Sequence, residues 1–439
     1  MVYFKRFSIW QLFLFLMSLP TALALVGIIT AWLDVDLVVL GHLFEYVIPN
    51  AVLNTLGLVL GVAIVTAVLA VTSAWLTTVC EFPGRAFFSW ALILPMAIPG
   101  YVMAFALVGA LEYTGSFQTY LRESFGSSFL LPNVYSFGGV VLALSLTLYP
   151  YTYLLVRNAF QTQGRQSLEV GQSLGLTARQ SFWRISLPQA RPWIVGGSLL
   201  VMMETLADFG TVAVFNYDTL TTTIYQSWFS LFSFQSALQI ASLLLLFVVM
   251  VTVLERHGRN KQRFSQMRNT AQKQAYIQLP SLQAILACAF CSLIFLMGFM
   301  LPTGQLLLWA IPHMSLELTD QLWRYVAGSL GLSLLAMTII TVFALLLAFA
   351  ARTHNSRLAN WSVKISTMGY ALPGTVLAVG LLAPIIALDH YLARLGFSTP
   401  LLQGSIVVML LAYSVRFMAV AFSPIESNLL RVTSSIDAV

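Results

Sequence analysis

Long apolar runs separated by short polar segments form the dominant pattern of this chain. Crossing the hydrocarbon core of a bilayer as a helix takes about 20 predominantly apolar residues. Ten runs approach or exceed that length, near residues 10–32, 52–78, 87–111, 136–158, 192–216, 235–255, 281–302, 326–351, 362–387 and 403–423. The pattern therefore predicts an all-α polytopic membrane protein in which ten helices cross the bilayer.

A polar stretch at residues 169–188 interrupts this pattern between two apolar runs. Gly175 permits a tight turn, and Thr177 with Gln180 gives the S/T-x-x-E/Q spacing that caps the start of a helix. Pro188 is expected to stop that helix. The stretch predicts either two short helices that meet at an angle on the membrane face or an ordinary amphipathic connecting loop. Three large apolar side chains would suit a partner that receives a helix in a groove: Phe182, Trp183 and Ile185.

Composition and charge placement indicate the environment and the orientation. Hydrophobic residues make up 59% of the chain and charged residues only 9%, more apolar surface than a soluble globular fold needs. Of the 22 lysines and arginines, only Arg122, Arg324 and Arg394 fall in segments predicted to lie on the outer side. Basic residues favour the cytoplasmic side, so the N-terminus and the 169–188 stretch are predicted to be cytoplasmic. Because the basic residues sit in short loops between apolar runs, nucleic acid is not expected as a partner.

The two halves of the chain resemble each other. The segment Asn54–Leu58 (NTLGL) matches Gly328–Leu332 (GSLGL) at an offset of 274, and the same offset brings Pro99–Gly100 onto Pro373–Gly374. Six spans separate corresponding points, so both halves enter the membrane in the same sense, as a parallel repeat. A Pro-Gly pair predicts at least a kink, and its occurrence in both halves favours a kink that belongs to a gate or pathway.

The repeat divides the chain into a first repeat at residues 1–256, a basic cytoplasmic linker at 257–280 and a second repeat at 281–439. Leu168–Glu169 matches Ile436–Asp437 at an offset of 268, so the sequence stops as the second equivalent of the polar stretch begins. We therefore expect a truncated product of a roughly twelve-helix protein, lacking the rest of that stretch and two further helices.

Charged residues inside apolar runs are candidate functional groups. Glu204 and Asp208 lie one helical turn apart in the fifth run, so a continuous helix would place both carboxylates on one face. A charge at the bilayer centre costs about 2.5–3.5 kcal/mol on insertion scales, so neither is expected to face lipid. They either line a pathway for a hard, oxygen-seeking cation, or they are protonated or bonded to neighbouring helices as structural groups. Arg416 in the tenth run could act as a counter-charge or reach the cytoplasmic interface.

The sequence lacks the motifs of an enzyme or a metal site. It contains no G-x-x-x-x-G-K-[ST] phosphate loop, so the chain is not expected to hydrolyse ATP. The five histidines are scattered without metal-ligand spacing. Cys288 and Cys291 lie inside an apolar run and are interpreted as packing residues. No metal site and no cofactor are predicted.

The polar stretch is similar to the EAA loop of bacterial ABC-importer permeases, except that Val170 and Gly171 replace the usual alanines. The matching positions are Glu169, Gly175, Ile185, Leu187 and Pro188. The resemblance implies that residues 165–190 form a coupling loop that docks onto an ATP-hydrolysing subunit. Its docking residues would be Glu169, Gly171, Gly175, Phe182, Ile185, Leu187 and Pro188, with Asp437 at the start of the second loop.

Further segments are similar to the ferric-iron branch of these permeases. They are Glu204–Val212, Thr221–Tyr225 with Trp228, and Arg416–Phe417 before Ala419–Phe422. The likeness covers nearly the whole chain and implies the type I importer fold, with two parallel six-helix repeats of which the second is incomplete. A translocation pathway would be lined by Glu204, Asp208, Arg416, Pro99, Gly100, Pro373 and Gly374.

This resemblance implies a multi-pass protein of the bacterial inner membrane that works by alternating access. Its partners would be a periplasmic substrate-binding protein, two copies of a cytoplasmic ATPase and the lipid bilayer. Ferric iron is the expected cargo, and thiamine, polyamine, sulfate or a phosphonate are alternatives within the family. The alternative outside it is a transporter driven by a proton or sodium gradient, with Glu204 and Asp208 as the titrating pair.

Overall fold

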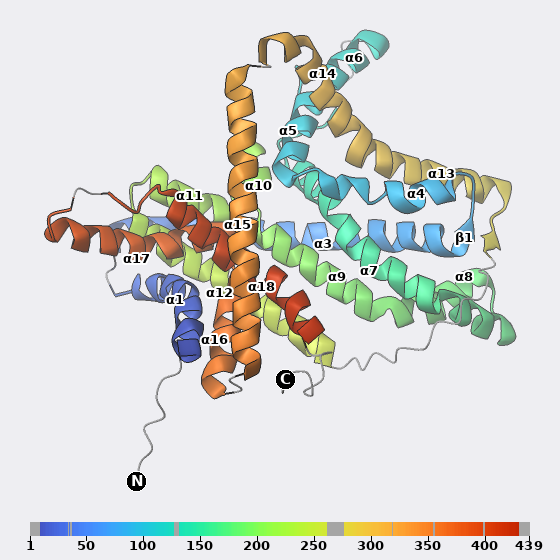
Figure 1. Ribbon diagram of the computed structural model, residues 1–439. Coiled ribbons are helices and arrows are strands. Elements are labelled where there is room, and N and C mark those ends of the chain that lie inside the picture. Colours follow the sequence, from blue (N-terminus) through green and yellow to red (C-terminus); the bar gives the residue numbers. More distant parts are fainter. Residues whose placement is uncertain are drawn as a thin grey trace. The chain divides into compact units, whose positions relative to one another are not determined.

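The computed structural model describes residues 9–33, 35, 37–126, 131–260, 276–317, 319–353, 356–397 and 400–429, and these residues are almost entirely helical (Figure 1). The first elements are α1 Ile9–Thr30, α2 Leu37–His42, η1 Leu43–Val47, α3 Ile48–Val79, β1 Cys80–Glu81, α4 Arg85–Ala91, η2 Leu94–Ala97, α5 Gly100–Leu111, α6 Ser116–Phe125, α7 Phe137–Ser173, α8 Ala178–Ser181, η3 Phe182–Ser186 and α9 Leu187–Ala207. The remaining elements are α10 Gly210–Val214, α11 Leu220–Phe229, α12 Phe234–Asn260, β2 Ile277–Gln278, α13 Ser281–Phe295, η4 Leu296–Met300, α14 Leu301–Glu317, α15 Asp320–Thr353, α16 Arg357–Met368, η5 Gly369–Ala371, α17 Gly374–Arg394 and α18 Ile406–Leu429.

Eight helices in the described residues are long and apolar enough to cross a membrane, or up to nine if one bent pair counts as a single span. The all-α membrane fold is therefore confirmed, but three of the ten predicted spans are broken. The predicted span 87–111 bends by 97° at the break between Ala97 and Gly100. The predicted span 192–216 is interrupted where α9 ends at Ala207. The predicted span 362–387 is interrupted between η5 and α17, just before Gly374. All three breaks occur at residues of the predicted pathway.

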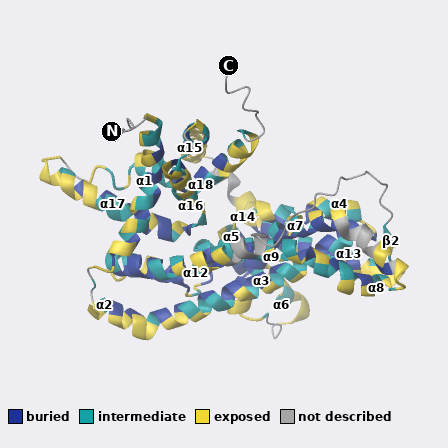
Figure 2. Cartoon of the chain, turned by 90° about the horizontal axis from the view of Figure 1, so that it is seen from below, coloured by how far each residue is buried: buried dark blue, intermediate teal, exposed yellow. Residues whose placement is uncertain are grey.

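The packing of α3 shows how the apolar sequence is used. Its buried face carries small and medium side chains, including Ala51, Ala70 and Ala74, which let α7 and α9 approach closely. The opposite side exposes large apolar side chains, among them Leu60 and Ile64. In a soluble protein such a face would be unfavourable, whereas in a bilayer it meets lipid tails. Figure 2 shows the same alternation of buried and exposed residues along α3.

The described residues form two compact units, and neither is a continuous stretch of sequence. The first unit draws on residues 1–47, 223–246 and 314–439, and the second on 48–222 and 247–313. In the first unit, α1 packs on α16 and α17. In the second, α13 packs on α4, and α3, α7 and α9 lie side by side (Figure 1). The first unit holds most of the second predicted repeat but also contains α1, the first helix of the first repeat. The second unit holds most of the first predicted repeat but also contains α13, the first helix of the second repeat. The division into contiguous repeats remains a prediction about the sequence.

A two-stranded parallel pair attaches α13 to the connection between α3 and α4. Cys80 lies opposite Ile277 and Glu81 opposite Gln278. Arg85 forms an ion pair with Glu81 at 3.2 Å, and its guanidinium lies 3.8 Å from the centre of the Tyr276 ring. These contacts fix the described end of the predicted basic linker. Residues 261–275 of that linker lie outside the described residues.

Candidate functional site

The polar stretch at 169–188 forms a bend between two helices, which we call the elbow. Helix α7 ends at Ser173, and the next residues turn through Gly175, whose φ of +75° favours glycine. The N–H of Leu176 donates to the carbonyl of Gly171 at 2.9 Å, closing the last turn. The turn predicted at Gly175 is therefore confirmed.

The predicted helix cap is also confirmed, but the helix is longer than expected. The N–H of Gln180 donates to Thr177 Oγ1 at 3.3 Å, and the N–H of Thr177 donates to Gln180 Oε1 at 3.0 Å. The chain is then helical from Ala178 to Ala207, so the prediction of two short helices was wrong.

Pro188 does not stop this helix; it lies in the first turn of α9. The preceding segment, Phe182–Ser186, is a wider π-helical turn. Proline in a regular helix clashes with the carbonyl four residues earlier. The wider turn shifts the hydrogen-bond register there and accommodates the ring. The elbow therefore joins two long helices rather than two short ones.

Gly171 brings the two arms of the elbow into contact. A Cβ atom at this position would lie only 2.0 Å from Ser181 Oγ and 2.7 Å from Ser181 Cβ. The same Cβ would lie 3.4 Å from Ile185 Cδ1, so Ile185 packs on the same side. Gly171 and Ser181 are both buried. The absence of a side chain at Gly171 therefore sets the distance between α7 and the helix that follows the turn.

The predicted docking side chains differ in how accessible they are. Phe182 faces inward, with its ring 4.6 Å from the ring of Trp75 on α3. Ile185, Leu187 and Pro188 are half-buried, whereas Glu169 is exposed. The large apolar side chains that the elbow exposes are Val170 (51%), Leu174 (70%) and Trp183 (60%). Sequence reasoning missed Val170 and Leu174 as surface residues, although their spacing of four places them on one helix face. Asp437 lies outside the described residues.

Asp208 occupies the break that follows α9. Its backbone is extended, with ψ of 130°, so Glu204 and Asp208 do not share a continuous helix as predicted. The carboxylate bonds to the start of α10: Thr211 Oγ1 donates to Oδ2 at 2.9 Å and the Val212 N–H to Oδ1 at 3.2 Å. Thr221 Oγ1 donates to the Asp208 carbonyl at 2.7 Å. Asp208 thus ties α9, α10 and α11 together.

The break at Pro99–Gly100 packs against the break at Asp208. A Cβ on Gly100 would lie 2.6 Å from Thr211 Oγ1 and 3.4 Å from Asp208 Oδ2. On the other side, a Cβ on Gly210 would lie 2.8 Å from Tyr101 Cβ. Two of the predicted pathway groups, Gly100 and Asp208, are therefore brought together. Glu204 is half-buried in the last turn of α9, one turn before Asp208.

Substituting Asp208 distinguishes a capping role from a cation-binding role. Asparagine also accepts backbone hydrogen bonds at helix starts, so Asp208→Asn is expected to keep most of the stability. Asp208→Ala is expected to cost about 1–2 kcal/mol, because the start of α10 loses the acceptor for Thr211 Oγ1 and the Val212 N–H. Thermal unfolding of both variants in detergent measures the difference. A strong loss of transport in a fully stable Asp208→Asn variant would instead indicate that the charge contacts a cation.

The second Pro-Gly break, at Pro373–Gly374, lies in the first unit and is stabilised by Arg416. Its guanidinium donates to the Leu372 carbonyl and, at 3.3 Å, to the Tyr370 carbonyl. Both carbonyls precede Pro373, which stands just before α17. Helices α18 and η5 are close enough that a Cβ on Gly369 would lie 2.3 Å from the Val415 carbonyl oxygen. Arg416 thus satisfies carbonyls that the break releases.

Metal-ligating side chains do not gather within the described part of the chain. No group of three or more histidine, cysteine, aspartate or glutamate side chains there could hold a metal ion. The described geometry therefore offers a bent elbow and three helix breaks.

Comparison with known proteins shows what these features are similar to. The model of the binding-protein-dependent transport system inner membrane component matches residues 81–264, which include the elbow and Asp208. The Fe(3+)-transport system permease protein FbpB 2 of Haemophilus influenzae is 26% identical over 99% of this chain and 81% of its own length. The sulfate transport system permease protein CysT of Salmonella typhimurium is 28% identical over 34% of this chain and 52% of its own length. The molybdenum transport system permease protein ModB of Haemophilus influenzae is 27% identical over 42% of this chain and 80% of its own length. Residues 81–264 thus match the inner-membrane component of binding-protein-dependent transport systems, and nearly the whole chain is similar to a ferric permease.

Proposed function

We propose that this permease imports ferric iron, driven by an ATPase that is a separate polypeptide. The elbow is the observation that supports this proposal most directly. Its turn at Gly175, its capped second arm and its exposed Val170, Leu174 and Trp183 form a bent surface suited to a helix-in-groove contact. The similarity to a ferric permease over 99% of the chain supports iron as the cargo.

In the proposed cycle, a periplasmic binding protein delivers ferric iron to the outward-open permease, and two ATPase copies close on the cytoplasmic side. The N-terminus and the elbow then face the cytoplasm. Nucleotide binding shifts the permease between its two states only to the extent that the ATPase holds the elbow differently in each. The helix breaks at Pro99–Gly100 and Pro373–Gly374 are the proposed points at which the spans change direction along the pathway.

A gradient-driven mechanism fits the geometry of Asp208 less well. In that mechanism the carboxylate would bind and release a proton or sodium ion in each cycle. Here both carboxylate oxygens already accept hydrogen bonds, from Thr211 and from the Val212 N–H. Release of these bonds in each cycle would free the start of α10. We therefore assign Asp208 a structural role in the proposed importer.

Reconstitution tests the proposal as a whole. The chain is placed in proteoliposomes with an ABC ATPase and a periplasmic binding protein from the same source, and uptake of radioactive iron is followed. We expect uptake that requires internal ATP, stops with vanadate and is unaffected by collapse of ion gradients. Uptake driven by a gradient alone contradicts the ATP-driven mechanism. ATP-driven uptake of sulfate or molybdate, but not of iron, corrects only the cargo.

Gly175→Pro is expected to abolish this uptake while membrane insertion continues. Proline holds φ near −65°, so it cannot adopt the φ of +75° found at Gly175. The turn would reopen and the elbow would lose its shape. Gly175→Asn is the matched control, because asparagine tolerates positive φ. Full uptake by a well-expressed Gly175→Pro variant would reject the coupling role of the elbow.

A further inference from the structure

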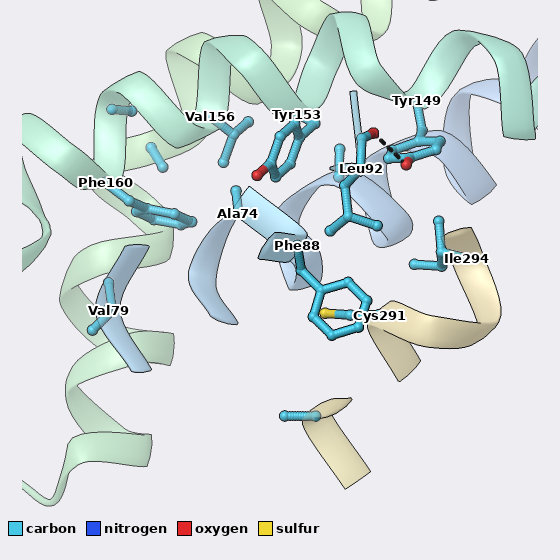
Figure 3. Packing of buried hydrophobic residues seen from close by; sticks show 14 of the residues in the cluster. Ala74, Val79, Phe88, Leu92, Tyr149, Tyr153, Val156, Phe160, Cys291 and Ile294 are labelled. Carbon is cyan, nitrogen blue, oxygen red and sulfur yellow. Dashed lines mark hydrogen bonds between the residues drawn. The ribbon is translucent and has the colours of Figure 1, made fainter. Parts of the chain in front are cut away.

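Three side chains on α7 point to the same region of the broken third span. Tyr149, Tyr153 and Arg157 are spaced by four residues, so they form one row on the helix. The Tyr149 hydroxyl donates to the Leu92 carbonyl at 2.5 Å. The Tyr153 hydroxyl at 3.1 Å and the Arg157 guanidinium at 2.7 Å both donate to the Ser89 carbonyl. Figure 3 shows the Tyr149–Leu92 bond with Tyr153 on the same helix.

The row of donors acts on carbonyls that the helix break has released. In a regular helix the Ser89 and Leu92 carbonyls would accept from Ile93 and Met96, respectively. Here the N–H of Ile93 donates to the Trp90 carbonyl instead, and the N–H of Met96 donates to the Ile93 carbonyl. In the membrane core no water can satisfy such carbonyls, so side-chain donors must do so. The three residues therefore hold α4 and the start of η2 to α7.

Helix α7 also reaches the elbow. It runs without interruption from Phe137 to Ser173 and carries Gly171, the contact between the elbow arms. At 1.5 Å per residue, Arg157 and Gly171 are roughly 21 Å apart along the helix axis. A displacement of the elbow therefore moves the same helix that grips α4 and η2. Helix α5, which starts at Gly100 beside Asp208, follows directly after this gripped segment.

We propose that α7 transmits movement of the elbow to the broken third span, and that Tyr149, Tyr153 and Arg157 are the positioning residues that make this transmission rigid. The inference rests on the proposed ATP-driven function and adds how the ATPase would reach the break at Pro99–Gly100. Without these three donors, the elbow still engages the ATPase, but the third span no longer moves together with α7.

The second half of the chain contains a comparable arrangement. By the repeat offset of 268, α18 corresponds to α7, and Arg416 falls one residue before the equivalent of Tyr149. Arg416 likewise donates to carbonyls released before a Pro-Gly pair. The fourth span of each half therefore supplies donors to the broken third span of the same half. The chemistry differs, with two tyrosines and an arginine in one half and an arginine in the other.

The test separates transport from ATP hydrolysis in the full complex with the ATPase and binding protein. The variants Tyr149→Phe, Tyr153→Phe and Arg157→Met remove the donors singly and together while keeping the bulk of each side chain. Thr147→Val is the matched control, because the bonds described for the Thr147 hydroxyl stay within α7, to the Ala143 and Leu144 carbonyls. For the triple variant we expect about a ten-fold rise in ATP hydrolysed per iron imported, equivalent to about 1.4 kcal/mol of lost coupling. The control ratio should stay that of the wild type.

A labelling measurement shows whether the break still responds to nucleotide. Tyr101→Cys places a thiol at the start of α5, where Tyr101 is half exposed. Cys288 and Cys291 are replaced by serine. Cys80 remains, because burial raises the pKa of its thiol to about 12 and leaves little reactive thiolate. With the donor row intact, maleimide labelling of Tyr101→Cys should change on addition of ATP and vanadate. In the triple variant the change should be lost, while crosslinking of Trp183→Cys to the ATPase persists.

The outcomes distinguish this inference from the proposed function. A wild-type complex without ATP-driven import rejects the proposed function and, with it, the inference. A wild-type complex that imports iron, together with a triple variant of unchanged coupling ratio and unchanged nucleotide-dependent labelling, overturns the inference alone. If the triple variant fails to fold, the single Tyr153→Phe variant decides, with an expected rise in the coupling ratio of about three-fold, equivalent to about 0.7 kcal/mol.

Discussion

Gly171→Ala is expected to abolish ATP-driven uptake, although alanine is the residue usually found at this position of the EAA loop. The added Cβ would lie 2.0 Å from Ser181 Oγ and 2.7 Å from Ser181 Cβ, and both atoms are buried. Rotating the Ser181 side chain removes only the first of these contacts, so the two arms must move apart. Overpacking of this kind costs about 1–3 kcal/mol. The exposed surface of the elbow would then no longer match its partner.

A second substitution tests whether this clash is the cause. Ser181→Gly removes both atoms that collide with the new methyl group, so the double variant Gly171→Ala with Ser181→Gly should regain much of the uptake. Ser181→Ala should restore less, because it keeps the Cβ at 2.7 Å. Co-purification of the ATPase and iron uptake are measured for all three. Wild-type uptake by Gly171→Ala alone would show that the elbow tolerates a wider separation.

Local signals explain why the turn and cap of the elbow could be predicted from sequence. Positive φ at Gly175 and the reciprocal bonds of Thr177 and Gln180 depend on residues within a few positions of each other. The length of the helix after the turn could not be predicted in this way. Pro188 normally ends a helix, but the wider turn at Phe182–Ser186 accommodates it, and this turn leaves no simple sequence pattern.

The helix break at Asp208 was missed because hydrophobicity continues through it. Residues 192–216 read as one span, and the bonds of Asp208 to Thr211 and Val212 that form at the break leave no established sequence pattern. Because the run was interpreted as one continuous helix, Glu204 and Asp208 were predicted to lie on one face. Conversely, the Pro-Gly pairs correctly marked breaks, because a missing N–H and a flexible glycine act locally.

Long-range packing could not be predicted from the sequence. Nothing in the apolar run of α1 indicates that it packs on α16 and α17, or that α13 packs on α4. The orientation of Phe182 toward Trp75 likewise depends on how α3 meets the elbow. The donors Tyr149 and Tyr153 were overlooked because tyrosines in an apolar span are common packing residues, and their role depends on the carbonyls opposite them.

Arg416→Met is expected to destabilise the protein strongly and to abolish uptake. Methionine fills a similar volume but donates no hydrogen bond, so the Tyr370 and Leu372 carbonyls lose their shared donor at the break before Pro373. Hydrogen bonds to charged groups contribute about 1.5–3 kcal/mol each, and loss of this donor to the buried Leu372 carbonyl adds a desolvation cost. We expect a large fall in the thermal unfolding temperature in detergent, with uptake falling in proportion to the folded fraction.

Arg416→Gln separates this structural role from that of a charge lining the pathway. Glutamine carries no charge, yet its amide N–H₂ can still donate to a carbonyl. If Arg416 supports the break, the glutamine variant should be more stable than the methionine variant and should retain more uptake per folded molecule. If its charge instead acts on the cargo, both variants should lose uptake equally, even where glutamine restores stability. The hydrogen bonds to the break favour the first result, because the guanidinium is already committed to the Tyr370 and Leu372 carbonyls.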